Sequence, residues 1–154
     1  IPVAVYAYVA AKDKKEMEKE AEEFYKASKK YKPTYYWLDV EEKTMKDMNA
    51  GVEAFRAKLA SLGVKNIGIY IGTYFMEEHS ISTDKFTALW IPTYGYDDGY
   101  YNAAPLTDSE YDLHQYTSQG QLNGFSHYLD LNQISTIQDQ ETIYRKLFTV
   151  PKDE

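Results

Sequence analysis

Asp39 and Glu41 are the two side chains of this sequence whose types and spacing most directly suggest chemistry. On a β-strand, residues i and i+2 point to the same side and lie about 6.5 Å apart along the chain. Both carboxyl groups would therefore face one cavity, beside Trp37 and within reach of Trp90. Two carboxylates held close together repel each other when both are ionised, so we expect one of them to keep its proton near neutral pH. A proton donor beside an anion is the pair that cleaves a glycosidic bond through an oxocarbenium-like state.

A simpler interpretation of Asp39 and Glu41 is a solvated strand end that caps a helix N-terminus through its favourable dipole. The spacing of the two acids does not by itself separate these interpretations. The preceding Trp37-Leu38 pair and the 16 tyrosines of the chain favour the cavity. Tyrosine joins an apolar ring to a hydroxyl, which suits polar ligands with apolar faces such as sugars, although many tyrosines could equally be half-buried strand residues.

Few other residues could do chemistry. Asp130 lies on a short apolar strand, where it could belong to the same site or cap a turn or helix. His114 could act as a general base at the end of another strand, although a hydrogen-bonded histidine at the rim is the more common arrangement. The three histidines lack zinc-binding spacing, and the chain has neither a Gly-x-Ser-x-Gly elbow nor any cysteine. No metal site and no nucleophilic triad is therefore expected.

Composition excludes several classes of protein. The 154 residues suit one domain, and 44% hydrophobic with 27% charged residues is ordinary for a globular chain. A net charge of −7 makes nucleic acid an unsuitable partner, because binding to phosphates needs a basic patch. No apolar run approaches the ~20 residues that span a bilayer, so membrane insertion is not expected. No signal peptide opens the chain, and its start at Ile1-Pro2 instead of Met suggests that a preceding segment has been removed.

The elements that must position these residues alternate between strand and helix. The charged stretch that contains Met17, Ala21 and Phe24 has the spacing of an amphipathic helix with a solvated Lys/Glu face. We predict strands at residues 1–10, 34–41, 66–72, 87–92, 111–116 and 128–131. We predict helices at residues 13–30, 46–62, 82–86 and 139–148, with a long surface loop over residues 94–110.

This alternation favours a parallel sheet with right-handed crossovers, either as an open doubly wound sheet or as a (β/α) barrel. A doubly wound nucleotide-binding protein should carry a glycine-rich turn after its first strand. Residues 10–13 contain no glycine. We therefore predict an α/β fold of the TIM-like barrel type, in which functional groups lie at the C-terminal ends of the strands.

Polar and aromatic residues do collect at the ends of the predicted strands, where a purely structural pattern would scatter them. They are Tyr6, Tyr8, Asp39, Glu41, Tyr70, Trp90, Tyr94, His114, Gln115, Tyr116, Asp130 and Asn132. This distribution predicts one site at one rim of the barrel.

Six segments also occur in the order found in glycoside hydrolase family 25, the lysozymes (N-acetylmuramidases) common in phage endolysins and bacterial autolysins. They cover residues 1–8, 38–41, 68–72, 89–94, 114–120 and 129–132. The chain resembles this family over residues 1–134. Residues 39–48 are especially similar to endolysin catalytic domains of phages that infect Gram-positive bacteria.

The resemblance implies a modified (β/α) barrel, with residues 1–154 as one domain that corresponds to strands 3–8 and a less clearly matched tail at 138–154. It implies cleavage of the β-1,4 bond between N-acetylmuramic acid and N-acetylglucosamine of bacterial peptidoglycan, with no metal or organic cofactor. Glu41 matches the proton donor, Asp39 the acid that stabilises the cation or orients the N-acetyl group, and Asp130 the acid of the final strand. The positions that line the substrate groove match Tyr6, Tyr8, Tyr70, Trp90, Tyr94 and Gln115.

The chain departs from the family pattern in two places. His114 stands where the family usually has a tryptophan before Gln-Tyr-Thr-Ser, a change that would alter sugar stacking. The family's opening strand with Asp-x-Ser, its first helix and its second strand have no counterpart, so Ile1 aligns with the third strand and one catalytic-centre aspartate is missing. Loss of two strands would expose a sheet edge and part of the core. We therefore expect a fragment, or a chain that self-associates through its open barrel edges or pairs with another chain.

Three functions compete on this sequence. The first is an active muramidase at the bacterial cell wall, outside the cell, encoded by a phage or prophage and released at lysis. The second is a wall-binding module that keeps a tyrosine-lined groove but catalyses little, because the opening aspartate is absent. The third is a barrel scaffold used in phage or cell-wall assembly.

Overall fold

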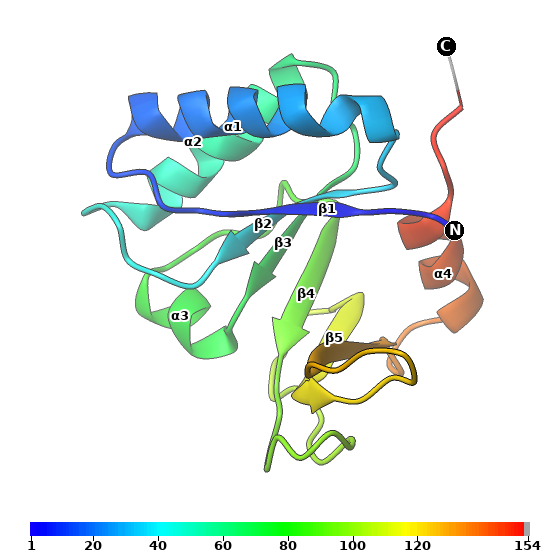
Figure 1. Ribbon diagram of the computed structural model, residues 1–154. Helices are drawn as coiled ribbons and strands as arrows, with labels where there is room; N and C mark the ends of the chain where they lie inside the picture. Colours follow the sequence, from blue (N-terminus) through cyan, green and yellow to red (C-terminus); the bar gives the residue numbers. More distant parts are fainter. Residues whose placement is uncertain (153–154) are drawn as a thin grey trace.

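The computed structural model describes residues 1–152, in which strands and helices alternate along the chain (Figure 1). The strands are β1 (Val5–Tyr8), β2 (Tyr36–Val40), β3 (Ile67–Ile71), β4 (Ala88–Pro92), β5 (Leu113–Gly120) and β6 (Leu129–Ile134). The helices are α1 (Lys14–Ser28), followed by a 3-10 turn (Lys29–Tyr31), then α2 (Met48–Ser61), α3 (Thr73–Glu78) and α4 (Gln140–Phe148).

One curled sheet carries all six strands in the order β1-β2-β3-β4-β5-β6. Strands β1 to β5 are parallel, whereas β6 is antiparallel to β5. The curled sheet confirms the predicted α/β architecture of a TIM-like barrel, of which the described residues form an open half. The expectation of a wholly parallel sheet is wrong at β6. Residues 121–128 form a loop too short for the dozen or more residues that a parallel crossover needs.

Helices α1 and α2 cover the convex face of the sheet and pack against each other (Figure 1). Each begins at an aspartate whose side chain accepts a hydrogen bond from a backbone N–H of the first turn, Asp13 for α1 and Asp47 for α2. Their apolar faces meet the outward residues of β2, β3 and β4 in the main hydrophobic core. Its fully buried members include Met17, Leu38, Phe55, Leu59, Ile69, Ile71 and Ile91.

The concave face of the sheet has its own, smaller core, which α4 closes. Ile143 and Leu147 of α4 are each 2% exposed and pack with Tyr35, Trp37 and Ala88. Figure 1 shows α4 beside the start of the chain, away from α1 and α2. The helix therefore fills the end of the half-barrel that carries the N-terminal ends of the strands.

One ion pair and one glycine support this smaller core. Lys146 Nζ lies 2.8 Å from Asp112 Oδ1, and Asp112 Oδ2 accepts the Leu89 N–H at 2.9 Å. Gly68 is needed because a Cβ there would lie 2.4 Å from the Trp37 ring. The bulky indole can thus lie flat across the neighbouring strand.

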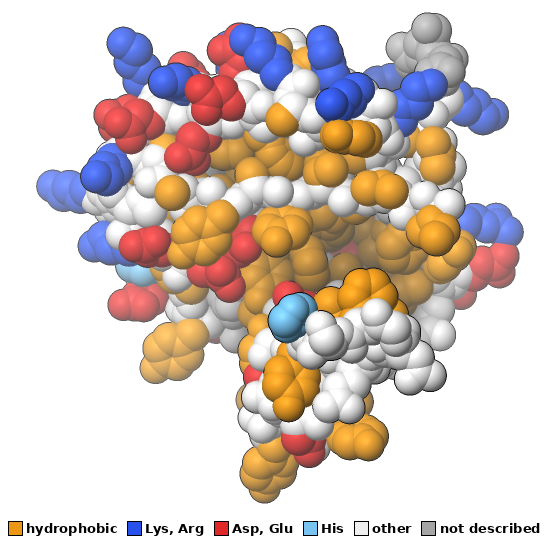
Figure 2. All heavy atoms as spheres, in the orientation of Figure 1, with side chains coloured by type: hydrophobic (Ala, Val, Ile, Leu, Met, Phe, Trp, Pro, Cys, Tyr) orange, Lys and Arg blue, Asp and Glu red, His pale blue; other side chains and the backbone are white. Residues whose placement is uncertain are grey.

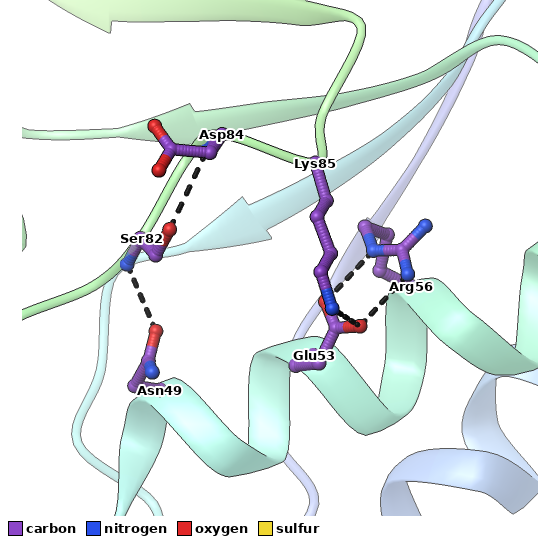
Figure 3. Close-up of polar contacts among 6 residues, drawn as sticks. All are labelled: Asn49, Glu53, Arg56, Ser82, Asp84 and Lys85. Atoms are coloured by element: carbon purple, nitrogen blue, oxygen red, sulfur yellow. Dashed lines mark hydrogen bonds and ion pairs between the residues drawn. The ribbon is translucent and has the colours of Figure 1, made fainter.

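The predicted helix at residues 82–86 is wrong. Figure 3 shows the reason: the Ser82 N–H donates to Asn49 Oδ1 of α2 at 2.8 Å, and Lys85 Nζ lies 3.3 Å from Glu53 Oε1, which also pairs with Arg56. These contacts with α2 hold the segment in a turn. The helix in this region is α3, Thr73–Glu78, in residues for which the sequence predicted neither helix nor strand.

The other elements follow the prediction with shifted boundaries. The first strand is confined to Val5–Tyr8, while β5 and β6 run further than expected, to Gly120 and Ile134. Residues 94–110 contain no helix or strand, as predicted, and the fifth strand begins at Leu113 instead of Tyr111. Among the described residues, no helix is long and apolar enough to cross a membrane.

Candidate active site

A cavity of about 250 Å³ opens at the C-terminal edge of the sheet. Its lining residues are Tyr6, Asp39, Glu41, Tyr70, Trp90, Tyr94, Gln115 and Asp130. They include eight of the nine residues that the family resemblance implied for catalysis and the groove, and the exception is Tyr8. Figure 2 faces this side of the molecule, where acidic side chains border a hollow whose walls are largely hydrophobic.

The register of the sheet explains why residues far apart in sequence meet here. Asp39 is paired with Tyr70, and Tyr70 with Trp90, across three parallel strands. Paired residues of neighbouring strands point to the same face, so these three side chains all enter the concave side. Gln115 lies closer to the C-terminal edge of the sheet than Trp90 does, opposite Asn132 of β6. The antiparallel course of β6 therefore brings its first residues, including Asp130, to the same rim.

Asp39 is half-buried, whereas Glu41 and Asp130 are exposed at the mouth of the cavity. Burial, the charge of Glu41, a hydrogen bond with the Glu41 carboxyl and the charge of Asp130 together raise the pKa of Asp39 to about 7. Asp39 Oδ1 is buried and has no hydrogen-bond partner in the part of the chain that the structure describes. Asp39 is thus not a solvated strand end, and the cap of the following helix is Asp47 instead.

Hydrogen bonds to one residue, Gln115, fix the cavity wall opposite the acids. The Tyr70 hydroxyl donates to Gln115 Oε1 at 2.6 Å, and the Tyr94 hydroxyl donates to the same oxygen. Burial, more than any other cause, raises the pKa of Tyr70, which keeps this phenol neutral and a donor. With its oxygen occupied by two donors, the Gln115 amide has a set orientation.

Trp90 forms the floor of the cavity and is fixed by three neighbours. Its Nε1–H donates to Asn132 Oδ1 at 2.8 Å. Its ring meets Tyr70 and Trp37 edge-on, with centroids 4.8 Å and 5.4 Å apart. Edge-to-face packing of this kind is favourable for aromatic pairs. The aromatic floor is therefore preformed.

Asp97 anchors the loop that carries Tyr94, and sequence analysis missed it. Its Oδ1 accepts hydrogen bonds from Thr117 Oγ1 at 2.6 Å and from the Ser118 N–H at 2.7 Å, and its Oδ2 accepts from Ser118 Oγ at 2.6 Å. These bonds lower the pKa of Asp97. Its position in a loop rich in Asp, Asn and Gly is typical of turns, so nothing in the local pattern indicated contacts with β5.

Tyr8 and His114 do not line the cavity. Tyr8 is 47% exposed, and its hydroxyl donates to Glu42 Oε2 at 3.2 Å beside the mouth. His114 is 2% exposed, and its Nε2 lies 2.7 Å from the Thr93 carbonyl oxygen. Burial lowers the pKa of His114. The expected effect of His114 on sugar stacking is therefore not supported, because the ring lies behind the wall.

No cluster of three or more histidine, aspartate or glutamate residues suited to a metal ion occurs within residues 1–152. The site can supply carboxyl groups of different exposure, hydrogen-bonding amide and phenol groups, and aromatic surfaces. This set of groups suits acid catalysis on a polar ligand with apolar faces.

Comparison with known proteins decides the family. The sequence model of glycosyl hydrolases family 25 matches residues 1–125. The chain belongs to this family. None of the curated proteins matches the family 25 chain.

Solved structures agree with this assignment. A glycosyl hydrolase 25 of Streptococcus pneumoniae, described as the virulence factor GHIP participating in host cell invasion, is 64% identical with a TM-score of 0.96. The match covers 98% of this family 25 chain and 66% of that one, so the chain spans just under two thirds of the pneumococcal protein. The catalytic domain of endolysin ply40 from bacteriophage P40 of Listeria monocytogenes is 27% identical with a TM-score of 0.83, over 95% of this chain and 71% of that one.

A third solved structure shows the fold alone. The autolysin LytC of Streptococcus pneumoniae, in complex with a synthetic peptidoglycan ligand, is 20% identical with a TM-score of 0.70, over 87% of this family 25 chain and 34% of that one. Among these structures, the endolysin is more distant than the pneumococcal GHIP. The specific likeness to phage endolysins expected from sequence is therefore not supported, whereas membership of the family is.

Proposed function

We propose that this family 25 chain is a muramidase that hydrolyses the β-1,4 bond between N-acetylmuramic acid and N-acetylglucosamine in bacterial peptidoglycan. The observation that carries the proposal is the cavity itself, in which Asp39, Glu41 and Asp130 face aromatic walls. Its place of action would be the bacterial cell wall, where the polymer lies.

Glu41 is the proposed general acid. It lies exposed at the mouth, where a glycosidic oxygen can reach it, while Asp39 lies deeper. Below about pH 7 Asp39 holds a proton, and its hydrogen bond with Glu41 gives that proton a route to the leaving oxygen. Donation by Glu41 cleaves the bond between the anomeric carbon and that oxygen, which leaves as a hydroxyl group. A water molecule then bonds to the anomeric carbon and gives its proton to a carboxylate of the cavity, which completes the hydrolysis.

Asp39 and Asp130 are the proposed stabilisers of the positive charge. When Glu41 donates its proton, the glycosidic bond breaks and positive charge develops on the sugar ring. The carboxylates that remain in the cavity face this charge, and their attraction is strongest where the site excludes water. The polymer's sugars would lie against Tyr6, Trp90 and Tyr94, with Gln115 hydrogen-bonded to a polar substituent.

The test is the clearing of purified Gram-positive cell walls, measured as loss of turbidity. Glu41→Gln removes the acid but keeps the side chain's size, so we expect the rate to fall by about 10²–10⁴. Glu42→Gln is the matched control, because Glu42 is the next residue and lies outside the cavity lining. Equal clearing by the wild type and Glu41→Gln would show that Glu41 is not the acid.

A second candidate function is binding of wall carbohydrate with little hydrolysis. It is favoured by the open half-barrel, because β1, which carries Tyr6 of the cavity lining, has β2 as its one strand neighbour among the described residues. Sedimentation of the protein with insoluble peptidoglycan, without any loss of turbidity, would favour this function. A protein that neither clears nor sediments with walls would exclude both candidates.

A further inference from the structure

A second hollow lies beside the cavity, at the loop that joins β5 to β6. Residues 121–128, which we call the hairpin loop, enclose with Tyr100 a space of about 850 Å³. The apolar side chains that border it are unusually open to solvent: Tyr100 is 75% exposed, Phe125 and Tyr128 are each 62% exposed and Leu122 is 54% exposed. Exposure of several large apolar side chains around one hollow is typical of a binding surface.

The hairpin loop is continuous with the wall of the cavity. Tyr128, Asp130 and Asn132 are exposed, while Leu129 and Leu131 between them are half-buried. Asp130 and Asn132 are alternate residues of β6 and share a face. Asp130 lines the cavity and Asn132 holds Trp90, whereas Tyr128 immediately precedes β6 and lines the second hollow. The second hollow is therefore reached two residues before Asp130 along the chain.

Backbone contacts hold both sides of this hollow in place. Within the hairpin loop, the Phe125 N–H donates to the Leu122 carbonyl at 3.0 Å, and Gly124 supplies the positive φ of +94° that the turn needs. On the other side, the Gly99 N–H donates to Thr117 Oγ1 at 3.0 Å and so fixes the loop that carries Tyr100 against β5. The exposed rings are thus carried by two loops whose backbones are held in place by hydrogen bonds.

The chemistry of the hairpin loop points to the rings and hydroxyl groups of a carbohydrate. Residues 121–128 contain no Asp, Glu, Lys or Arg, although 27% of the chain is charged. Between the apolar side chains stand the amides of Gln121 and Asn123, the hydroxyl of Ser126 and the imidazole of His127. Aromatic faces combined with uncharged hydrogen-bonding groups suit sugar rings and their hydroxyls. A charged peptide or an anionic membrane surface would instead be matched by charged side chains.

We propose that the hairpin loop and Tyr100 bind sugar units of the same glycan strand beyond those in the cavity. This inference rests on the proposed function, because it takes the strand that occupies the cavity to continue over Tyr128. The surface adds affinity for long strands and contributes nothing to the bond-breaking step. It makes the protein selective for polymer over short oligosaccharides.

The experiment measures dissociation constants for glycan strands freed of their stem peptides, using the Glu41→Gln protein so that the strands stay intact. A tetrasaccharide is compared with strands of about twelve sugars, in proteins with and without Phe125→Ala and Tyr128→Ala. We expect the two substitutions together to raise the dissociation constant for the long strands about 25-fold, since an aromatic contact buried in a complex commonly contributes about a fivefold change and the two factors multiply. The tetrasaccharide should bind unchanged.

Tyr144→Ala is the matched control, because Tyr144 is an exposed aromatic residue on α4 at the other end of the half-barrel, and it should change neither value. In the protein with Glu41 intact, the same pair of substitutions should raise KM for long strands and leave kcat unchanged. Sedimentation velocity is run on every variant, so that a change in self-association is seen separately. Leu122→Ser provides a third, independent substitution on the same surface.

Equal affinity of the double variant and its parent for long strands would overturn the inference while leaving the proposed function intact. An equal loss for the long strands and the tetrasaccharide would also overturn it, because the surface would then be part of the cavity. A change in molecular mass in place of a change in glycan affinity would assign the hollow to contacts between copies. A wild-type protein that binds neither glycan and clears no walls would refute the proposed function itself.

Discussion

Asp39 differs from the other two acids of the cavity in its access to water, and this difference gives the site its pH dependence. Desolvation favours the neutral form of a carboxyl group, and the neighbouring charges of Glu41 and Asp130 act in the same direction. The pair Asp39 and Glu41 can therefore hold a proton at a pH where an isolated aspartate is ionised. The buried Oδ1 of Asp39 has no partner among the described residues, so this carboxyl group is held in the cavity at a cost to stability.

We expect this cost to appear as a pH-dependent stability difference between the wild type and Asp39→Asn. The native pKa of about 7 exceeds the ordinary aspartate pKa of 3.8, so the wild type loses stability as the pH rises from about 4 through 7. The asparagine side chain at position 39 of the variant does not titrate. Its advantage in unfolding free energy should grow by about 1–3 kcal/mol between pH 4 and pH 8, after allowance for partial solvent screening of Asp39.

Urea unfolding at several pH values measures this difference, and Asp108→Asn, at an exposed carboxyl group, is the matched control. A difference between wild type and Asp39→Asn that stays constant with pH would contradict the assignment of the proton to Asp39. If the site is a muramidase, the wall-clearing rate of the wild type should also decline above about pH 7, because the proton for the leaving oxygen is then lost.

Two elements outside the sheet position the residues of the site. The loop after β4 carries Tyr94 into the cavity and is fastened to β5 by Asp97 and by the Gly99 N–H. Helix α4 fills the opposite end of the half-barrel and supports Trp37, whose ring in turn meets Trp90. The floor and one wall of the cavity thus depend on contacts made outside the cavity, with β5 and with α4 at the opposite end of the half-barrel.

Replacing Asp97 should loosen the loop that carries Tyr94. Asp97→Ala removes the acceptor for Thr117, Ser118 and a backbone N–H, so the amide of Ser118 should exchange with solvent faster. We expect weaker binding of glycan, with a larger effect on KM than on kcat. Hydrogen exchange and wall-clearing kinetics measure the two effects, and Asp108→Ala in the same segment is the control. Unchanged exchange at Ser118 would show that Asp97 does not hold the loop.

Shortening a core residue of α4 should destabilise the whole sheet. Leu147 is 2% exposed and packs in the concave core. Leu147→Ala leaves a cavity there, and we expect a loss of about 2–5 kcal/mol in unfolding free energy. The control is Arg145→Ala, two residues away, whose ion pair with Glu141 is exposed and should matter little. If both variants were half unfolded at the same urea concentration, α4 would not contribute to the cooperative fold.

For the molecule as a whole, the notable feature is a sheet with two open edges. Among the described residues, β1 pairs with β2 alone, and Val3 and Tyr6 beside that edge are 50% and 67% exposed. Unpaired strand edges with apolar neighbours tend to associate. Self-association through the barrel edges stays a prediction of this arrangement.

Analytical ultracentrifugation tests this prediction against the 17.9 kDa mass of one chain. We expect a mass near twice that value at high concentration. The N–H groups of Val5 and Val9 bond to β2, so those of Tyr6 and Tyr8 point outward along the free edge. Tyr8→Pro removes one outward donor and should shift the equilibrium toward monomer, whereas Tyr144→Ala on α4 should not. A monomer at every concentration would contradict self-association.

Sequence by itself determined the features that depend on local pattern. The alternation of apolar strands and amphipathic helices predicted the α/β barrel architecture, because periodicity reflects which side of each element is buried. The same pattern placed Asp39, Glu41, Tyr70 and Trp90 at the ends of strands that the parallel part of the sheet brings to one rim. Asp130 reaches that rim because it lies near the start of the antiparallel β6.

Tertiary structure alone decided which of these residues share the cavity and what surrounds them. The direction of β6, the exclusion of Tyr8 and His114, and the anchoring role of Asp97 all depend on contacts between residues distant in sequence. The turn at residues 82–86 likewise reflects its bonds to α2 and not its own helix preference. Local propensities are small compared with burial and hydrogen bonding across the fold, and so these contacts outweigh them.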